Sequence, residues 1–240
     1  MIDIVEEIRQ LTSSILCNIV HIKMKKETSM RFIGDVHGKW KQYKRIIKDC
    51  DASIQVGDLG LGFVRKHGWS AGQIYSNPPH YAMVRGDHKF IRGNHDNPGE
   101  CAKHSQWIPD GHYDKDNDMF FIGGALSVDK AFRTEGYDWW SDEELSMDFL
   151  YNLLDKYLQI KPKIMVTHDC PDVVSDVLFL HQRFKEKSRT GQALSEMFNA
   201  WQPKLWIHGH WHISSDTVIN GTRFICLAEL ETIDIDLSQV

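Results

Sequence analysis

The stretch Met30-Arg31-Phe32-Ile33-Gly34-Asp35-Val36-His37-Gly38 joins a short apolar run to a carboxylate and an imidazole. Residues 30–33 are typical of a strand, and residues 39–49 after them are typical of a helix. A second apolar run, residues 52–56, ends at Gly57-Asp58. Both carboxylates are therefore expected just beyond the C-terminal ends of strands, which is the rim where α/β sheets bind ligands.

Three later strand-like runs repeat this arrangement, because each ends at a motif with polar side chains. The runs and motifs are residues 89–91 before Arg92-Gly93-Asn94-His95-Asp96, residues 163–166 before Thr167-His168, and residues 205–207 before His208-Gly209-His210-Trp211-His212. Together the five motifs supply two aspartates, one asparagine and four histidines as candidate metal ligands. These are Asp35, His37, Asp58, Asn94, His168, His210 and His212.

The spacing of these residues favours metal chelation. Asp35 and His37 are two positions apart where a strand ends, so both side chains can point the same way. His210 and His212 repeat this spacing. Asp58 can reach between two ions, and two cations sharing one carboxylate lie about 3.5–4 Å apart, lower the pKa of the water between them and clamp a phosphoryl centre. Such ligands fit manganese first, with Fe, Zn, Co, Ni or Mg as alternatives.

Each motif alone is weak evidence, because a lone Gly-Asp or a lone His is more often a turn or core residue. All five in one order, each at a strand end, are specific, and this order resembles the calcineurin-like metallophosphoesterase family. The resemblance spans residue 30 to about residue 230. It implies a four-layer α/β/β/α sandwich, two divalent metal ions and hydrolysis of a phosphate ester by a metal-bridging hydroxide.

The resemblance also assigns individual roles to the motif residues. One ion would be held by Asp35, His37, Asp58 and His212, and the other by Asp58, Asn94, His168 and His210. His95 would stabilise the transition state or protonate the leaving oxygen, and Asp96 would orient its ring. Arg92 would touch a phosphate oxygen, with an ion pair at the surface as the alternative. His208 would be structural.

One departure from the family pattern bears on the substrate. Phosphoprotein phosphatases usually continue the second motif as Asp-Arg-Gly, whereas this chain reads Asp58-Leu59-Gly60 and has no arginine until Arg65. The first prediction is therefore a phosphoesterase acting on a small molecule or nucleotide. The alternatives are a phosphoprotein phosphatase, a nuclease, or a non-catalytic scaffold of the same fold, and the complete ligand set argues against the scaffold.

Composition narrows the possible partners and location. The net charge of −5 comes from 28 basic and 33 acidic residues that are scattered along the chain, which argues against a dedicated nucleic-acid surface. Five cysteines without a C-x-x-C pair indicate free thiols in a reducing compartment, and Cys170 beside a candidate ligand is expected to be a buried core residue. No secretory leader or membrane span is evident, so a cytoplasmic protein is expected.

The chain is expected to divide into an extension and one domain. Residues 1–29 predict an amphipathic helix followed by a polar linker, and this helix packs on the domain or on a second subunit as a homo-oligomer contact. Residues 30–240 form the metallophosphoesterase domain.

Later elements of the domain have clear local signals. Residues 119–122 predict a strand, and the Gly123-Gly124 segment after it could form one wall of the pocket, with Arg133 as a second phosphate contact. Ser141 with Glu144 predicts a capping box for a helix running to about Tyr157. The remaining predictions are a helix over 190–200, a hairpin turning at Asn220-Gly221 and a last strand over 232–237.

Overall fold

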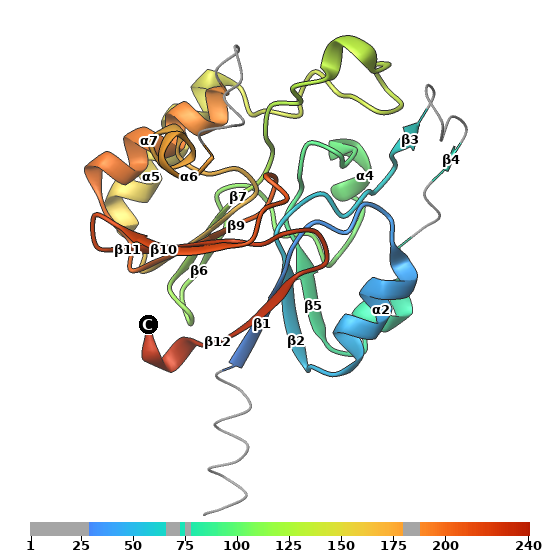
Figure 1. Cartoon of the computed structure of the whole chain (residues 1–240), viewed down its shortest axis with the longest axis horizontal. Helices are drawn as coiled ribbons and strands as arrows, with labels where there is room; N and C mark the ends of the chain where they lie inside the picture. Colours follow the sequence, from blue (N-terminus) through green and yellow to red (C-terminus); the bar gives the residue numbers. More distant parts are fainter. Residues whose placement is uncertain (1–28, 66–72, 75–77, 180–187) are drawn as a thin grey trace, which may run out of the picture.

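The computed structural model describes residues 29–65, 73–74, 78–179 and 188–240 (Figure 1). The expected N-terminal helix, its linker and the subunit contact through it lie outside the described residues, apart from Ser29, which belongs to the first strand. The boundary between extension and domain therefore stays a prediction. No helix in the described ranges has the length and apolar character needed to cross a membrane.

A small sheet forms the first half of the domain. Its strands lie in the order β12 (Thr232–Asp236), β1 (Ser29–Ile33), β2 (Ala52–Gln55) and β5 (Asp87–Phe90). β1, β2 and β5 are parallel, whereas β12 returns antiparallel to β1. Its outer side carries α2 (Trp40–Lys48), the short α3 (His80–Met83) and the short α4 (Pro98–Cys101). The carboxyl ends of three parallel strands therefore meet at one rim.

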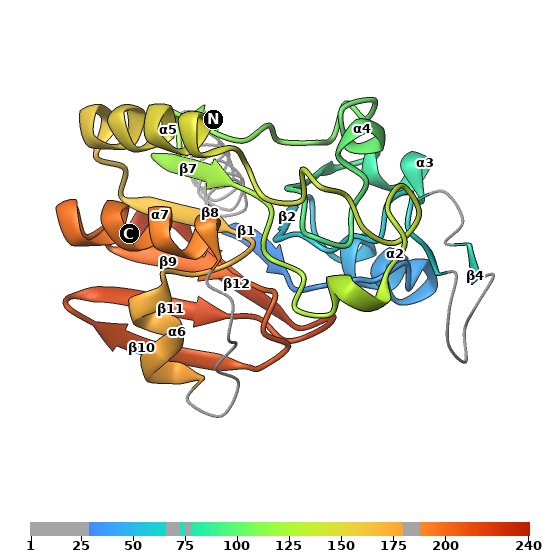
Figure 2. The ribbon, with the colours of Figure 1, turned by 90° about the horizontal axis from the view of Figure 1, so that it is seen from above.

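A larger sheet faces the small one. Its strands lie in the order β10 (Ser215–Ile219), β11 (Thr222–Cys226), β9 (Leu205–His208), β8 (Ile164–Thr167), β7 (Met119–Ile122) and β6 (Tyr113–Asp114). The four central strands are parallel, and the two edge strands are antiparallel to their neighbours. Helices α5 (Met147–Ile160), α6 (Asp172–Leu178) and α7 (Arg189–Ala200) cover its outer face (Figure 2).

The remaining elements within the described ranges are short. A two-stranded ribbon pairs β3 (Val64–Arg65) with β4 (Gln73–Ile74), and two single 3₁₀ turns cover Lys130–Phe132 (η1) and Leu237–Gln239 (η3).

Alternation along the strands creates four layers. In β7, the Phe120 side chain packs against the helices of the large sheet, while Phe121 points between the two sheets. In β1, Phe32 joins the core between the sheets and Ile33 packs with the α2 helix. Strands buried on both faces are uniformly apolar, and each such side chain stabilises the fold by roughly 1.5–3 kcal/mol. The expected α/β/β/α sandwich is confirmed.

The hairpin prediction is confirmed and the capping-box prediction is wrong. Asn220 and Gly221 both have positive φ, 49° and 84°, as the tight turn between β10 and β11 requires. The helix predicted to open at Ser141 begins instead at Met147, where the Ser146 hydroxyl accepts a hydrogen bond from the Phe149 amide at 3.3 Å. Glu144 is drawn away from a cap because it accepts hydrogen bonds from α7 and from Ser188.

Candidate metal centre

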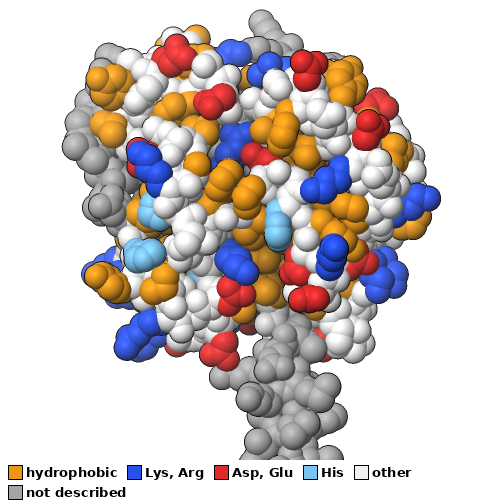
Figure 3. All heavy atoms as spheres, turned by 180° about the vertical axis from the view of Figure 1, so that it is seen from behind, with side chains coloured by type: hydrophobic (Ala, Val, Ile, Leu, Met, Phe, Trp, Pro, Cys, Tyr) orange, Lys and Arg blue, Asp and Glu red, His pale blue; other side chains and the backbone are white. Residues whose placement is uncertain are grey.

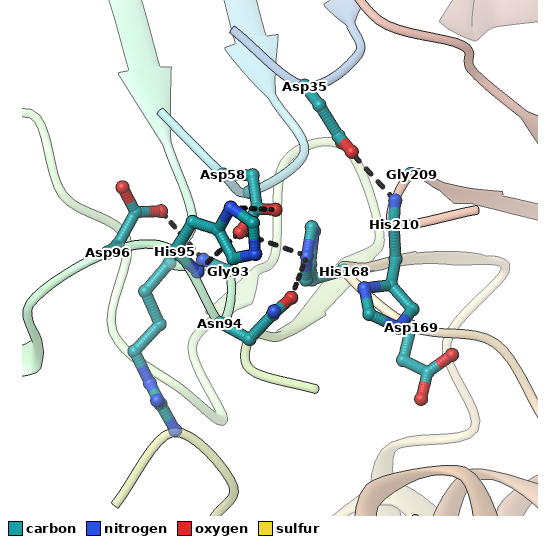
Figure 4. Close-up of polar contacts among 12 residues, drawn as sticks. Asp35, Asp58, Gly93, Asn94, His95, Asp96, His168, Asp169, Gly209 and His210 are labelled. Atoms are coloured by element: carbon teal, nitrogen blue, oxygen red, sulfur yellow. Dashed lines mark hydrogen bonds and ion pairs between the residues drawn. The ribbon is translucent and has the colours of Figure 1, made fainter. Parts of the chain in front are cut away.

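Five strand ends deliver the predicted ligands to one rim. Asp35 follows β1, Asp58 follows β2 and Asn94 follows β5, while His168 follows β8 and the His210 loop follows β9. The amides of Val36 and His37 both donate to the Asp58 carbonyl at 2.9 Å, which ties the first two loops together. The rim of the small sheet and the rim of the large sheet therefore contribute to the same site (Figure 4).

The backbone at this rim is strained. Four predicted ligands lie in the left-handed region that glycine favours: His37 (φ 47°), Asp58 (φ 57°), His210 (φ 68°) and His212 (φ 54°). A residue with a side chain in this conformation costs about 1–2 kcal/mol relative to the right-handed region. Strained residues of this kind cluster where the surrounding structure holds side chains for a function.

Four of the predicted ligands converge tightly. One ligand atom from each lies within 4.8 Å of the others, and the four residues are Asp35, His37, Asp58 and His212. The Nε2 atoms of His37 and His212 are 3.0 Å apart, and Oδ2 of Asp58 lies 3.7 Å from Nε2 of His37. Imidazole nitrogens and carboxylate oxygens that face one another at such distances are arranged like the ligands of a common cation.

Unsatisfied atoms in this group test whether a cation fits. Oδ2 of Asp35 is fully buried and forms no well-aligned hydrogen bond with the described residues, although Nε2 of His212 lies 2.9 Å away and the contact with Asp35 raises the pKa of His212. A buried carboxylate oxygen without a donor is costly. A divalent cation would satisfy this oxygen and both ring nitrogens together, so the residues fit a metal ion.

Asn94 and His168 adjoin this group through the second oxygen of Asp58. Nε2 of His168 lies 3.3 Å from Oδ1 of Asp58 and 3.1 Å from Oδ1 of Asn94. The Nδ1 atom of His168 faces the Val56 carbonyl at 2.9 Å and donates to it, so Nε2 is the nitrogen that would bind a cation. Burial lowers the pKa of His168, but the Asp58 carboxylate outweighs it and raises that pKa to about 10. A proton on Nε2 of His168 therefore lies between the two oxygens, where a bound cation would replace it.

His210 is less closely gathered than the other predicted ligands. Its ring lies beside the His168 ring, with centroids 5.1 Å apart, and its backbone amide donates to Oδ1 of Asp35 at 3.2 Å (Figure 4). Burial lowers the pKa of the His210 ring, which favours the neutral form that a metal ligand needs. His208 is buried in the core, and burial lowers its pKa to about 4, in keeping with a structural role.

His95 stands at the open side of the cluster. Its amide donates to Oδ1 of Asp58 at 2.7 Å, and its Nδ1 lies 3.2 Å from Nδ1 of His37. Its side chain keeps 21% exposure, so a substrate can reach the ring. Phe63 stacks on one face of the ring, and Nη2 of Arg133 lies 2.6 Å from Nε2. Burial, assisted by the Arg133 charge, holds the pKa of His95 well below its usual value.

Arg92 does not reach the site. Its side chain is 3% exposed, its Nε donates to Asp110 at 2.8 Å, and its Nη1 donates to the carbonyls of Asp142 and Glu143. The structure therefore does not place Arg92 at a phosphate. Its ion pair with Asp110 is buried and does not lie at the surface. The buried guanidinium instead connects the loop after β5 to Asp110 and to the residues that precede α5.

Asp96 also has a different task from the one expected. Its two oxygens accept hydrogen bonds from four backbone amides, those of Leu59, Gly60, Leu61 and Gly93, at 2.7–3.1 Å. Among the described contacts none joins it to the His95 ring, so it does not orient that ring. It instead ties the loop after β2 to the loop after β5, and Figure 4 shows its contact with Gly93 in the second of these loops.

Sequence reasoning missed the residues that stand behind the ligands. Ser127 accepts a hydrogen bond from Asn94 and donates to Glu143, and Asp169 accepts from the Trp211 indole at 3.1 Å. Ser127 lies in the segment expected to form a pocket wall, but nothing local marked it. Cys170 is buried against the helices, as predicted, and the four described cysteines are free.

Comparison with known proteins identifies the family. A family model described as calcineurin-like phosphoesterase matches residues 30–214, and the chain therefore belongs to that family. No curated protein matches the sequence. Family membership together with the cluster of aspartates and histidines supports phosphoesterase activity.

Solved structures resemble the chain more distantly. A predicted phosphoesterase from Streptococcus pneumoniae is 14% identical over 87% of this chain and 83% of that one, with a TM-score of 0.39. A putative 5'-nucleotidase from Staphylococcus aureus is 13% identical over 86% and 50%, with a TM-score of 0.47. A phosphopantetheinyl hydrolase from Mycobacterium tuberculosis is 14% identical over 84% and 89%, with a TM-score of 0.42. Such low similarity says nothing about the substrate.

Proposed function

We propose that this protein is a dinuclear metal-dependent phosphoesterase that hydrolyses a phosphate monoester or diester of a small molecule or nucleotide. The observation that carries the proposal is the convergence of four ligand atoms within 4.8 Å, among them a buried carboxylate oxygen that receives no well-aligned hydrogen bond from the described residues. Manganese is the first candidate metal, and Fe, Zn, Co, Ni or Mg are alternatives, because oxygen and imidazole ligands suit these ions.

Asp58 supports a pair of cations rather than one. Its Oδ2 faces His37 at 3.7 Å, and its Oδ1 faces His168 at 3.3 Å, so one carboxylate serves two groups of ligands. Two cations bound there would supply a water of lowered pKa and an electrostatic clamp on the phosphoryl oxygens. The histidines hold the pKa of Asp58 well below its usual range, although burial opposes them, so this carboxylate is ionised as a ligand must be.

His95 and Arg133 are placed to act on the substrate. A guanidinium only donates hydrogen bonds, so Nε2 of His95 accepts from Arg133 in the structure. In the proposed reaction, Arg133 turns from this nitrogen to an oxygen of the phosphate, where its planar group binds well. Nε2 of His95, released by Arg133, would take up a proton from solvent and pass it to the leaving oxygen.

The alternative functions gain no support from a specific contact. The phosphoprotein phosphatase alternative is weakened by the missing arginine after Asp58, and Arg92 does not replace that arginine, because its guanidinium is occupied by Asp110 and two carbonyls. On the face shown in Figure 3, Lys and Arg side chains are interspersed with Asp and Glu, which does not favour a nuclease that tracks a polymer. Metal content separates an enzyme from a scaffold, since a scaffold has no need of two ions.

The test compares two chromogenic substrates. Metal-stripped protein is reloaded with manganese and assayed with p-nitrophenyl phosphate and with bis-p-nitrophenyl phosphate. We expect hydrolysis of one of them to return with two manganese ions per chain. Asp216→Asn, which alters an exposed ion pair with Arg223, serves as a variant of unchanged activity. Protein that binds two ions and hydrolyses neither ester would overturn the proposal.

A further inference from the structure

A buried relay of hydrogen bonds begins at Asn94. Its Nδ2 lies 2.9 Å from Oγ of Ser127, which in turn lies 2.5 Å from Oε2 of Glu143. The amide of Ser127 donates to Oε1 of the same carboxylate at 2.9 Å. All three residues are buried, so water does not compete for these atoms. None of this follows from the family motifs, because Ser127 and Glu143 lie in the loop after β7.

The chemistry of the donors fixes the direction of the relay. Glu143, when ionised, only accepts hydrogen bonds, and a serine hydroxyl has a single proton to donate. The hydroxyl proton of Ser127 therefore goes to Glu143, and Oγ accepts from Asn94. The asparagine amide must then present its nitrogen to Ser127 and its oxygen to the other side. That other side holds Nε2 of His168, 3.1 Å from Oδ1 of Asn94.

The orientation matters because only one end of the amide can bind a cation. The carbonyl oxygen of asparagine is a metal ligand, whereas its NH₂ group is a donor that repels one. A flipped amide would place NH₂ toward the proposed cation and an oxygen against the lone pair of Ser127. The relay excludes this flip.

The fold holds both ends of the relay. Arg92, two residues before Asn94, donates from Nη1 to the Glu143 carbonyl at 2.9 Å, so the buried guanidinium joins the Asn94 loop to Glu143. Gly124 has φ +78°, and a Cβ placed there would come 2.3 Å from the Glu143 carbonyl oxygen. The absence of a side chain at Gly124 therefore allows the start of the loop after β7 to approach the backbone of Glu143 at the end of this loop.

We propose that Ser127 and Glu143 are positioning residues that orient the Asn94 amide, so that its oxygen and not its nitrogen faces the second cation. This rests on the proposed dinuclear function. The competing view is that the relay merely stabilises the loop after β7. The two views differ in what happens when the polarity of the relay is reversed without changing its shape.

Glu143→Gln makes that reversal. The glutamine oxygen still accepts from the Ser127 amide, but its NH₂ group now donates to Oγ. The hydroxyl proton of Ser127 is then directed at Asn94, which favours the flipped amide. We expect calorimetric titration with manganese to show one ion bound with unchanged affinity and the other weakened about 10- to 100-fold, the usual effect of losing a partner that orients a ligand.

Glu144→Gln is the matched control. Glu144 is the neighbouring buried carboxylate and accepts from Ser188 and from the Thr190 amide, without contacting Asn94. This variant tests whether a general loosening of the loop affects manganese binding. We expect it to bind two manganese ions with the affinities of the wild-type protein. Thermal unfolding of both variants shows whether their stabilities are comparable. Equal weakening of manganese binding in both would mean that the loop, not the relay, is responsible.

A second substitution provides a rescue. In Glu143→Gln combined with Asn94→Asp, the new carboxylate accepts the Ser127 proton with one oxygen and faces the cation with the other, so no orientation is needed. We expect tight binding of the second ion to return. Wild-type affinity in Glu143→Gln alone, or no recovery in the double variant, would overturn the proposal. Wild-type protein that binds fewer than two ions would instead contradict the dinuclear function itself.

Discussion

Two sets of loops at the same rim contribute to the site in different ways. The loops after β1, β2, β5, β8 and β9 carry every predicted ligand within a few residues of a strand end. The loop after β7 carries no predicted ligand, yet it contacts Asn94 through Ser127 and His95 through Arg133. The first set supplies the candidate ligand atoms, and the second contacts residues of the first from the side.

The difference shows why ligands are easier to find than their supports. A metal site demands a few atom types, and the motifs that supply them are short and local. A supporting residue needs only a donor or acceptor at the right point, which many side chains can provide. Ser127 is separated from Asn94 by 33 positions, and Arg133 from His95 by 38 positions, so no local pattern links them.

Asp58→Asn should have the largest effect, because Asp58 is the carboxylate that the two proposed cations would share. We expect phosphoesterase turnover to fall by at least about 10³-fold, more than the 10- to 100-fold typical of residues that only orient a ligand. Steady-state kinetics with manganese measure this, and thermal unfolding checks that the fold is kept. Turnover near the wild-type value would show that Asp58 is not a metal ligand, and the loops that carry candidate ligands would then not differ in role from the loop after β7.

His95→Ala is expected to slow turnover by about 10²- to 10⁴-fold while both metal ions stay bound. The reason is that the His95 ring lies beside the cluster, with Nδ1 3.2 Å from Nδ1 of His37 and 3.7 Å from Oδ2 of Asp58, while its Nε2 faces outward to Arg133. Metal analysis alongside kcat makes the test. A loss of metal in this variant would place His95 among the ligands.

Asp96→Asn tests a support that belongs to a ligand-bearing loop. The new NH₂ group would face two of the four backbone amides that Asp96 now accepts from, so two buried donors lose their acceptor. We expect the free energy of unfolding to fall by about 2–4 kcal/mol. Denaturant unfolding measures it, and a loss below about 1 kcal/mol would show that the clamp between the loops is unimportant.

Asp234→Asn should have the smallest effect, since it lies on β12, away from the rim. Its carboxylate accepts two hydrogen bonds from Arg31 at 2.7 and 2.8 Å, and these lower its pKa. A lowered pKa stabilises the fold above the unfolded value of about 3.9 and loses this contribution as the pH falls through the folded value. Because Asp234 is half exposed, we expect less than about 1 kcal/mol at pH 7 and no difference from wild type near pH 2. If the difference in the free energy of unfolding between wild type and variant were larger near pH 2 than at pH 7, the ion pair would not stabilise the fold in the predicted direction.

Much of the fold was accessible from the sequence, and the errors have one cause. The strand at residues 119–122 and the hairpin at Asn220-Gly221 were predicted because apolar runs and turn residues act locally. The helix at Ser141 was placed too early because Ser-x-x-Glu is a cap only where the backbone turns into a helix. Glu144 instead binds Ser188 and Thr190, which no local pattern reveals.

The sequence by itself determined the kinds of ligand and their places at strand ends, because both depend on residues that are close together in the chain. Only the tertiary structure decided that Arg92 is a buried clamp, that Asp96 joins two loops, and which oxygen or nitrogen of Asn94 faces the cluster. The physical reason is that a hydrogen bond has a direction. That direction depends on atoms brought together by folding from loops that are remote in the sequence.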